Sequence, residues 1–396
     1  MNLGAPIARV VTSGAMRLII PDSALPAPIS QNSSVPCAAI QTTLSRHLTE
    51  PVLLARWWTP EDPQKVTEVT DASTGEVMAR VCTDGIDIAS AVDHGRTVGQ
   101  GALGELTIHD RALLLKQLAQ YLNEHKQELY DLSYATGATL KDHFFDVDGG
   151  IGTLFTFSSK GRRELPNANV VVDGAVEQLS RDGSFLGEHI YTRMPGVAVQ
   201  INAFNFPVWG MLEKLAPAFI AGVPTIVKPA TPTAYVAVAA VRMMIDSGAL
   251  PEGALQVVAG SIPGLLDELG GQDHIGFTGS ADTAAMLRRD PAVTERSAHF
   301  NAEADSLNAS VLGPDAVPGE PEFDLFVKAL VTEMTVKAGQ KCTAIRRAIV
   351  PEPLGVGSEH RVVVRQASLV AMLQAYFDEL WETDDDKLVA RGRAAV

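Results

Sequence analysis

The stretch GVAVQINAFNFPVWGMLEKLAPAFIAGVPTIVK, residues 196–228, decides the fold class. It contains an apolar strand over 197–201, a helix from about Val208 to Ile220 that must accommodate Pro217, and a second apolar strand over 224–228. Two short buried strands joined through a helix are typical of a βαβ unit, whose strands run parallel. The stretch therefore predicts an α/β protein with a parallel sheet and with ligands at the carboxyl ends of its strands.

The same alternation continues towards the C-terminus. A helix is predicted from about Pro232 to Ser247-Gly248, because proline favours a first helical turn and glycine favours a helix end. A strand over 255–259 and a buried strand over 273–278 follow, and the latter ends on Gly279-Ser280 before another helix. Further on, we expect a strand near 308–312 and a helix from Pro321 to about Lys337.

Four features upstream can also be assigned. Residues 66–81 predict two short strands around a turn at 71–75, and residues 109–132 carry leucines at the spacing of an amphipathic helix. An Asp182-Gly183 turn predicts an exposed hairpin within 177–193. Residues 1–43 are rich in Pro, Ser and Ala without sustained periodicity, so we expect a poorly ordered extension there.

Composition narrows the class of protein. The chain has 396 residues and a formal net charge of -15, which argues against nucleic acid or an anionic membrane as its main partner. Its three cysteines are scattered and have no metal-ligand or disulfide spacing, so we predict no metal site and a reducing, cytoplasmic setting. No apolar run is long enough for a transmembrane helix.

Two residues have reactive side chains in suggestive settings. Cys342 follows the helix predicted over 321–337, in the small and polar run AGQKCTA at 338–344. Such a cysteine is either a nucleophile or an ordinary packing residue, and the helix dipole would raise its thiol pKa rather than activate it. Glu303 could act as a general base for water, or it could be a surface or capping carboxylate.

Three more candidate sites lie at the ends of predicted strands or just after them. Asn205 could donate a hydrogen bond to an oxyanion, or it could form a turn or cap a helix. Lys228 could reach ribose hydroxyls or phosphate, or it could simply be solvated. Gly279 and Ser280 could offer a backbone N–H and a hydroxyl to a pyrophosphate, although strand-to-helix turns use this pair routinely.

Taken together, these residues resemble the aldehyde dehydrogenase superfamily. FNFP at 204–207, VKP at 227–229, FTGS at 277–280 and GQKC at 339–342 match the family's motifs in the family's order. The resemblance implies an α/β fold with a Rossmann-type cofactor domain and a catalytic domain. It also implies Cys342 as nucleophile, Asn205 as oxyanion donor and Glu303 as general base.

The resemblance further implies a bound nicotinamide dinucleotide. Lys228 would hold the adenosine ribose, Gly279 and Ser280 the pyrophosphate, and the aromatic Phe204 would lie beside the cofactor. Many relatives that prefer NAD have a glutamate three residues after the lysine, where this chain has Thr231. A neutral hydroxyl tolerates a 2'-phosphate and Lys228 would balance its charge, so we expect NADP, with NAD possible.

A narrower resemblance concerns the substrate. Residues 202–214, 337–347 and EADSLN at 303–308 are similar to the aldehyde dehydrogenase part of PaaZ-type bifunctional proteins of phenylacetate degradation. This similarity implies oxidation of a small-molecule aldehyde, specifically a CoA-thioester semialdehyde of aromatic catabolism, to its acid. A reductase of the acyl-phosphate or CoA-acylating kind would need no water-activating carboxylate, and Glu303 therefore argues against it.

The resemblance ends near Pro351, and no Glu-x-Phe-Gly-Pro motif follows Cys342. We therefore expect a cofactor domain over 44–303 with a bridging hairpin near 173–193, and an incomplete catalytic domain over 304–351. A divergent tail would occupy 352–396, and no hydratase domain is expected. The family forms homo-oligomers, but the segment that completes them would be incomplete here. The alternative is a truncated, inactive homologue that only binds nucleotide.

Overall fold

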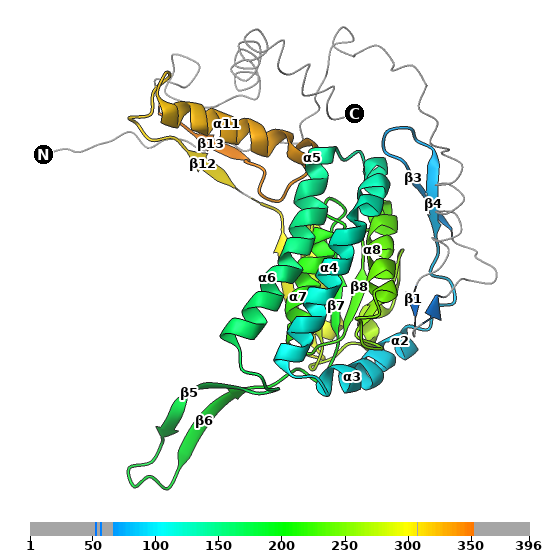
Figure 1. Cartoon of the computed structure of the whole chain (residues 1–396), viewed down its shortest axis with the longest axis vertical. Coiled ribbons are helices and arrows are strands. Elements are labelled where there is room, and N and C mark those ends of the chain that lie inside the picture. Colours follow the sequence, from blue (N-terminus) through cyan, green and yellow to red (C-terminus); the bar gives the residue numbers. More distant parts are fainter. Residues whose placement is uncertain (1–51, 54–55, 58–65, 307, 352–396) are drawn as a thin grey trace, which may run out of the picture. The chain divides into compact units, whose positions relative to one another are not determined.

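The computed structural model describes residues 52–53, 56–57, 66–306 and 308–351. The chain divides after Asp305 into two compact units, which are described one at a time. Figure 1 shows the described elements in colours that follow the sequence. The predictions made for 1–43 and 352–396 lie outside the described residues.

A sheet of seven strands forms the centre of the first unit. Its order is β11-β10-β7-β8-β9-β1-β2, in which the first five strands are parallel and the short β1 and β2 join antiparallel at one edge. The predicted parallel sheet is therefore confirmed. Its strands are β1 (Val52–Leu53), β2 (Arg56–Trp57), β7 (Ala198–Ile201), β8 (Thr225–Lys228), β9 (Leu255–Val257), β10 (His274–Gly279) and β11 (His299–Ala304).

Four helices cover one face of this sheet (Figure 1). They are α4 (Ile108–Ser133), α6 (Gly149–Glu164), α7 (Trp209–Ile220) and α8 (Ala234–Asp246). Helix α4 begins with a capping box, because the Thr107 hydroxyl accepts from the Asp110 N–H while the Asp110 carboxylate accepts from Thr107. Leu115, Leu118, Leu122 and Leu129 are buried against the other three helices, so the amphipathic helix predicted over 109–132 is confirmed.

Shorter helices cover the opposite face. The apolar side chains of α2 (Ile88–His94), the 3-10 turn η6 (Leu265–Glu268) and α10 (Pro291–Thr294) pack against β7, β8 and β10. Helix α9 (Ala281–Arg288) packs against β10 and β11 through Ala284 and Leu287. Ala284 is buried there.

Two hairpins belong to the first unit. Strands β3 (Thr67–Thr70) and β4 (Val77–Val81) flank the predicted turn at 71–75. Strands β5 (Val171–Gln178) and β6 (Leu186–Tyr191) form the predicted exposed hairpin, which projects from the unit in Figure 1. The remaining short helical segments are η2 (Gly95–Gly99), α3 (Gln100–Gly104), η3 (Tyr134–Thr136), α5 (Leu140–His143), η4 (Phe144–Asp148) and η5 (Thr231–Thr233).

The second unit contains Cys342. Its described part has two parallel strands, β12 (Ala309–Val311) and β13 (Arg347–Ile349), and helix α11 (Pro321–Thr335) followed by the 3-10 turn η7 (Val336–Gly339). Phe326, Val327 and Leu330 of α11 are buried against Leu312 and Val350. The predicted strand near 308–312 and the predicted helix from Pro321 are both confirmed.

Candidate functional site

Asn205 lies in the turn between β7 and α7, which the buried carboxylate of Asp146 supports. The Asp146 Oδ1 atom accepts hydrogen bonds from the backbone N–H groups of Val208 at 3.2 Å and Trp209 at 2.8 Å. These N–H groups at the start of α7 have no partner within the helix, so the carboxylate serves as a remote cap. Asp146 therefore fixes the turn that presents Asn205. The sequence pattern alone gave no sign of this partner, because it lies far upstream.

Phe204 lies in the same turn, and Lys228 lies on the neighbouring strand β8. Phe204 is 47% exposed, and its carbonyl accepts a hydrogen bond from the Thr233 hydroxyl at 3.0 Å. Lys228 is the last residue of β8, its Nζ atom lies 3.3 Å from the Pro229 carbonyl, and burial lowers its pKa. Thr231, the residue on which the expectation of NADP rests, opens η5 three residues later.

Gly279 and Ser280 form the turn from β10 into α9. A Cβ on Gly279 would lie 2.5 Å from the Phe277 ring, so the turn needs glycine there unless the ring moves. Ser280 is the N-cap of α9, and its hydroxyl oxygen accepts from the Thr283 N–H at 3.3 Å. The Asp305 carboxylate also accepts from the Ala281 N–H at 3.2 Å. A pyrophosphate bound to this N–H would replace that carboxylate.

Glu303 lies in β11, directly opposite Thr278 of β10. The carboxylate is exposed and lines a cavity of about 470 Å³ over β7, β10, β11 and α7. Lys214 of α7 lines the same cavity and is ion-paired with Glu213 at 2.9 Å. Lys214 is therefore a charged group in the same cavity as the predicted base Glu303, and the sequence did not single it out as a site residue.

Polar groups without partners lie at the same edge. Asn202 follows the last residue of β7, and its amide N and O atoms are both buried without a hydrogen bond to any described residue. The same is true of the Thr278 hydroxyl. A buried amide or hydroxyl without a hydrogen-bond partner lowers the stability of the fold. A polar ligand or water that binds here would supply the missing hydrogen bonds. This edge therefore fits a ligand with hydrogen-bonding groups.

Cys342 belongs to the second unit, and its thiol is exposed. The residues just before it have an unusual backbone, because Lys337, Ala338 and Gly339 have φ values of 50°, 52° and 75°. Non-glycine residues in this left-handed region are strained, and such strain persists only where other contacts hold the chain. The side chains of Glu333 and Asn308 make such contacts with the residues around Cys342. The first unit brings together Asn205, Lys228, Ser280 and Glu303 at the carboxyl ends of its parallel strands.

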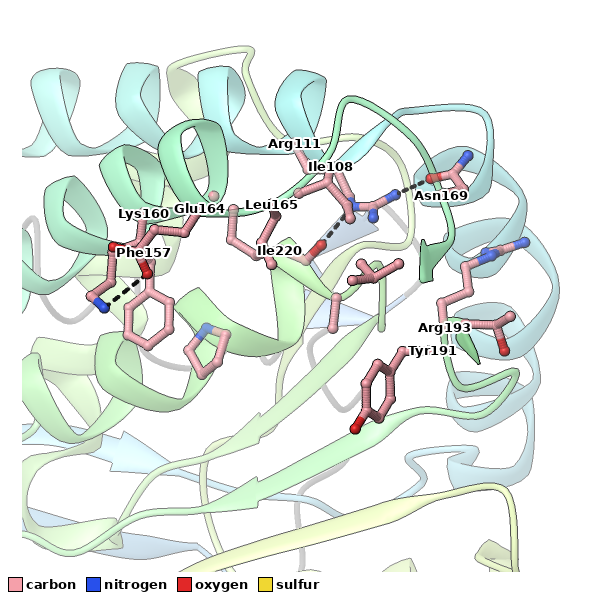
Figure 2. A pocket seen from close by; sticks show the side chains of 15 residues that line it. Ile108, Arg111, Phe157, Lys160, Glu164, Leu165, Asn169, Tyr191, Arg193 and Ile220 are labelled. Atoms are coloured by element: carbon pink, nitrogen blue, oxygen red, sulfur yellow. Dashed lines mark hydrogen bonds and ion pairs between the residues drawn. The ribbon is translucent and has the colours of Figure 1, made fainter. Parts of the chain in front are cut away.

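A second cavity of about 400 Å³ lies elsewhere in the first unit, at the base of the β5–β6 hairpin (Figure 2). Arg111, Tyr191 and Arg193 line it, and the Arg111 guanidinium donates to the Ile220 carbonyl at 2.9 Å. It contains none of the predicted site residues.

Within the described ranges, no three His, Cys, Asp or Glu residues are grouped so as to hold a metal ion, and no helix could cross a membrane.

Comparison with known proteins identifies the family. The model of the aldehyde dehydrogenase family matches residues 57–371, so the chain belongs to this family. The match extends beyond Pro351, where we expected the resemblance to end. It also extends across the start of the segment that we predicted to be a divergent tail.

Particular relatives agree with this assignment. The chain is 49% identical over 284 residues to a 3,4-dehydroadipyl-CoA semialdehyde dehydrogenase of Aromatoleum evansii, covering 72% of this chain and 55% of that protein. It is 27% identical over 360 residues to a mitochondrial succinate-semialdehyde dehydrogenase of Arabidopsis thaliana, covering 89% of this chain and 65% of the relative. The chain thus spans between about half and two thirds of the length of these two relatives.

Solved structures agree on the fold. An aldehyde dehydrogenase of Bacillus cereus in complex with NAD+ superposes with a TM-score of 0.68 at 20% identity, over 87% of this chain and 64% of the other. An NADP-dependent enzyme of E. coli gives the same TM-score at 21% identity, over 85% of this chain and 64% of the other. The predicted aldehyde dehydrogenase-like α/β fold is confirmed.

Proposed function

We propose that this chain oxidises an aldehyde to its carboxylic acid with a nicotinamide dinucleotide as hydride acceptor. The observation that carries the proposal is the grouping of Asn205, Lys228, Ser280 and Glu303 at the carboxyl edge of one parallel sheet. Ligands of open α/β sheets bind at this edge. Membership of the aldehyde dehydrogenase family also supports the proposed aldehyde oxidation.

The chemistry begins at the thiol of Cys342. Its thiolate attacks the aldehyde carbon and forms a thiohemiacetal, whose oxyanion accepts hydrogen bonds from the Asn205 amide and the Cys342 backbone N–H. Loss of a hydride from that carbon, for which a bound nicotinamide would supply the acceptor, would leave a thioester on Cys342. Glu303 then takes a proton from water, the hydroxide attacks the thioester, and the acid leaves as the thiol is restored.

Residues of the first unit would hold the cofactor. Lys228 would bind the adenosine ribose, Gly279 and Ser280 the pyrophosphate, and Phe204 would contact the dinucleotide. The unpartnered Asn202 amide and Thr278 hydroxyl offer further hydrogen bonds nearby. We propose NADP rather than NAD because Thr231 adds no negative charge near Lys228 and the ammonium would balance a 2'-phosphate.

We further propose a CoA-thioester semialdehyde of aromatic catabolism as the substrate, with a cytoplasmic setting. The support is the 49% identity to a dehydrogenase named for such a substrate. Phenylacetate degradation is the narrower form of this proposal and rests on the EADSLN motif at 303–308.

The test measures NADPH absorbance with purified protein, NADP and a CoA-linked semialdehyde, beside the Cys342→Ala variant. Reduction of NADP that vanishes in the variant supports the proposal. A folded chain that binds NADP but reduces none of it would overturn the oxidation and would favour the alternative, a homologue that only binds nucleotide.

A further inference from the structure

The residues on either side of Cys342 are both bound by one carboxylate. Glu333, near the end of α11, accepts from the Lys341 ammonium at 2.7 Å and 2.9 Å through its two oxygens. Its Oε2 atom also accepts from the Thr343 hydroxyl at 3.0 Å. The two neighbours of the cysteine in sequence are thereby tied to the same point on the helix.

A second anchor holds the backbone of the same loop. The side-chain amide of Asn308 donates to the Cys342 carbonyl at 2.5 Å, and the Asn308 carbonyl accepts from the N–H groups of Arg346 at 2.9 Å and Arg347 at 3.1 Å. Asn308 immediately precedes β12, and Arg347 begins β13. The loop that carries the thiol is therefore fixed from a helix and from a strand pair.

The pair of Glu333 with Lys341 is partly shielded from solvent. Their side chains are 26% and 12% exposed. Burial raises the pKa of Glu333, but the hydrogen bonds from Lys341 and Thr343 and the charge of Lys341 outweigh it, so the pKa is lowered overall. Glu333 thus remains a carboxylate at neutral pH and is ion-paired with the ammonium of Lys341, the residue that precedes Cys342. Removal of one partner from a partly buried pair leaves the other charge uncompensated.

We propose that Glu333 is a positioning residue for the nucleophile. It holds Lys341 and Thr343, the two sequence neighbours of Cys342, so that the sulfur has one orientation, and its charge balances that of Lys341. This inference rests on the proposed role of Cys342 as nucleophile. A merely structural role, in which Glu333 only secures the end of α11, is the competing explanation.

The experiment measures the alkylation rate of Cys342 by iodoacetamide at pH 7, read by mass spectrometry of the peptide that carries it. This reagent is uncharged, and the reaction needs neither cofactor nor turnover. Four proteins are compared: wild type, Glu333→Gln, the charge exchange Glu333→Lys/Lys341→Glu, and Glu322→Gln. The last changes an exposed carboxylate at the start of the same helix and is the matched control.

We expect Glu333→Gln to raise the alkylation rate by about ten-fold, because removal of the carboxylate makes the surroundings of the cysteine loop more positive by one charge, and positive charge favours the thiolate. The charge exchange restores a balanced pair and returns the rate to within about three-fold of wild type, and Glu322→Gln leaves it unchanged. In turnover, Glu333→Gln lowers kcat without changing the KM for NADP.

An alkylation rate in Glu333→Gln equal to that of wild type would overturn the inference. So would a charge exchange that fails to restore the rate, because that result assigns Glu333 to general stability. If Glu333→Gln does not fold, recovery of folding and of the wild-type rate in the exchange supports the pair, and failure of both rejects it. A wild type that is alkylated as described but never turns over rejects the proposed oxidation and leaves this inference standing.

Discussion

Glu303 of β11 lies directly opposite Thr278 of β10, in a parallel register that continues to Ala304 opposite Gly279. This pairing brings the predicted general base to the carboxyl end of β11, beside the predicted phosphate-binding turn at the carboxyl end of β10. The edge strand is exposed on alternate residues, so the Glu303 carboxylate is open to a substrate or a water molecule.

The first prediction concerns this carboxylate. Glu303→Gln keeps the shape of the side chain but cannot accept a proton, so thioester hydrolysis slows while hydride transfer continues. We expect steady-state turnover to fall by about 100-fold or more. A stopped-flow trace should still show a burst of up to one NADPH per chain. Glu295→Gln, an exposed carboxylate shortly before β11, is the control. Loss of the burst together with turnover would show that Glu303 acts before hydrolysis.

The sequence predicted the parallel sheet because each of its central strands is a short apolar run bounded by turn residues. It missed β11 because HFNAEA at 299–304 is not an apolar run like the central strands, although its alternation of polar and apolar residues is typical of a half-exposed strand. Glu303 was therefore selected from a motif, without the strand that positions it. Helix α6 was missed for a related reason, because its glycine-rich first turn lowers helix propensity while packing on α4 and α7 compensates.

Site residues divide in the same way. Those within a local motif, such as Ser280 and Lys228, could be selected as candidates from the sequence. The residues that support them were not, because Asp146 and Glu333 act on distant or flanking segments through hydrogen bonds that only the folded chain forms. A local sequence pattern can therefore point to candidate reactive side chains. The carboxylates that hold their segments in place are identified only from the tertiary contacts.

A second prediction concerns Asp146. Asp146→Ala removes the acceptor for the N–H groups of Val208 and Trp209 at the start of α7 and leaves them buried without a partner. We expect the free energy of unfolding to fall by about 1–3 kcal/mol. Asp146→Asn retains an acceptor oxygen and should lose less. Urea unfolding followed by circular dichroism measures both, and equal losses in the two variants would contradict the capping role.

A third prediction concerns the buried amide of Asn202. Asn202→Leu has a similar volume and removes two buried polar atoms that lack partners among the described residues. We expect the free energy of unfolding without cofactor to rise by about 1 kcal/mol, since an apolar replacement avoids the desolvation cost. NADP should bind more weakly, because the ligand loses a hydrogen-bonding group. Asn202→Asp, which buries a charge instead, should be destabilised. A variant of unchanged stability and unchanged NADP affinity would show that water already satisfies the amide.

The last prediction concerns the pH dependence of cofactor choice. Burial lowers the pKa of Lys228, so the ammonium loses its proton below its usual value of 10.5 as the pH rises. The charged form is the one that attracts a 2'-phosphate, and the preference for NADP over NAD should therefore decline in the alkaline range, starting below pH 10.5. Lys228→Arg keeps its charge throughout this range and should flatten the decline, whereas Lys228→Met should remove the preference at every pH. Fluorescence titrations with both dinucleotides between neutral and alkaline pH measure the ratio. A ratio that falls equally in wild type and Lys228→Arg would assign the pH dependence to another group.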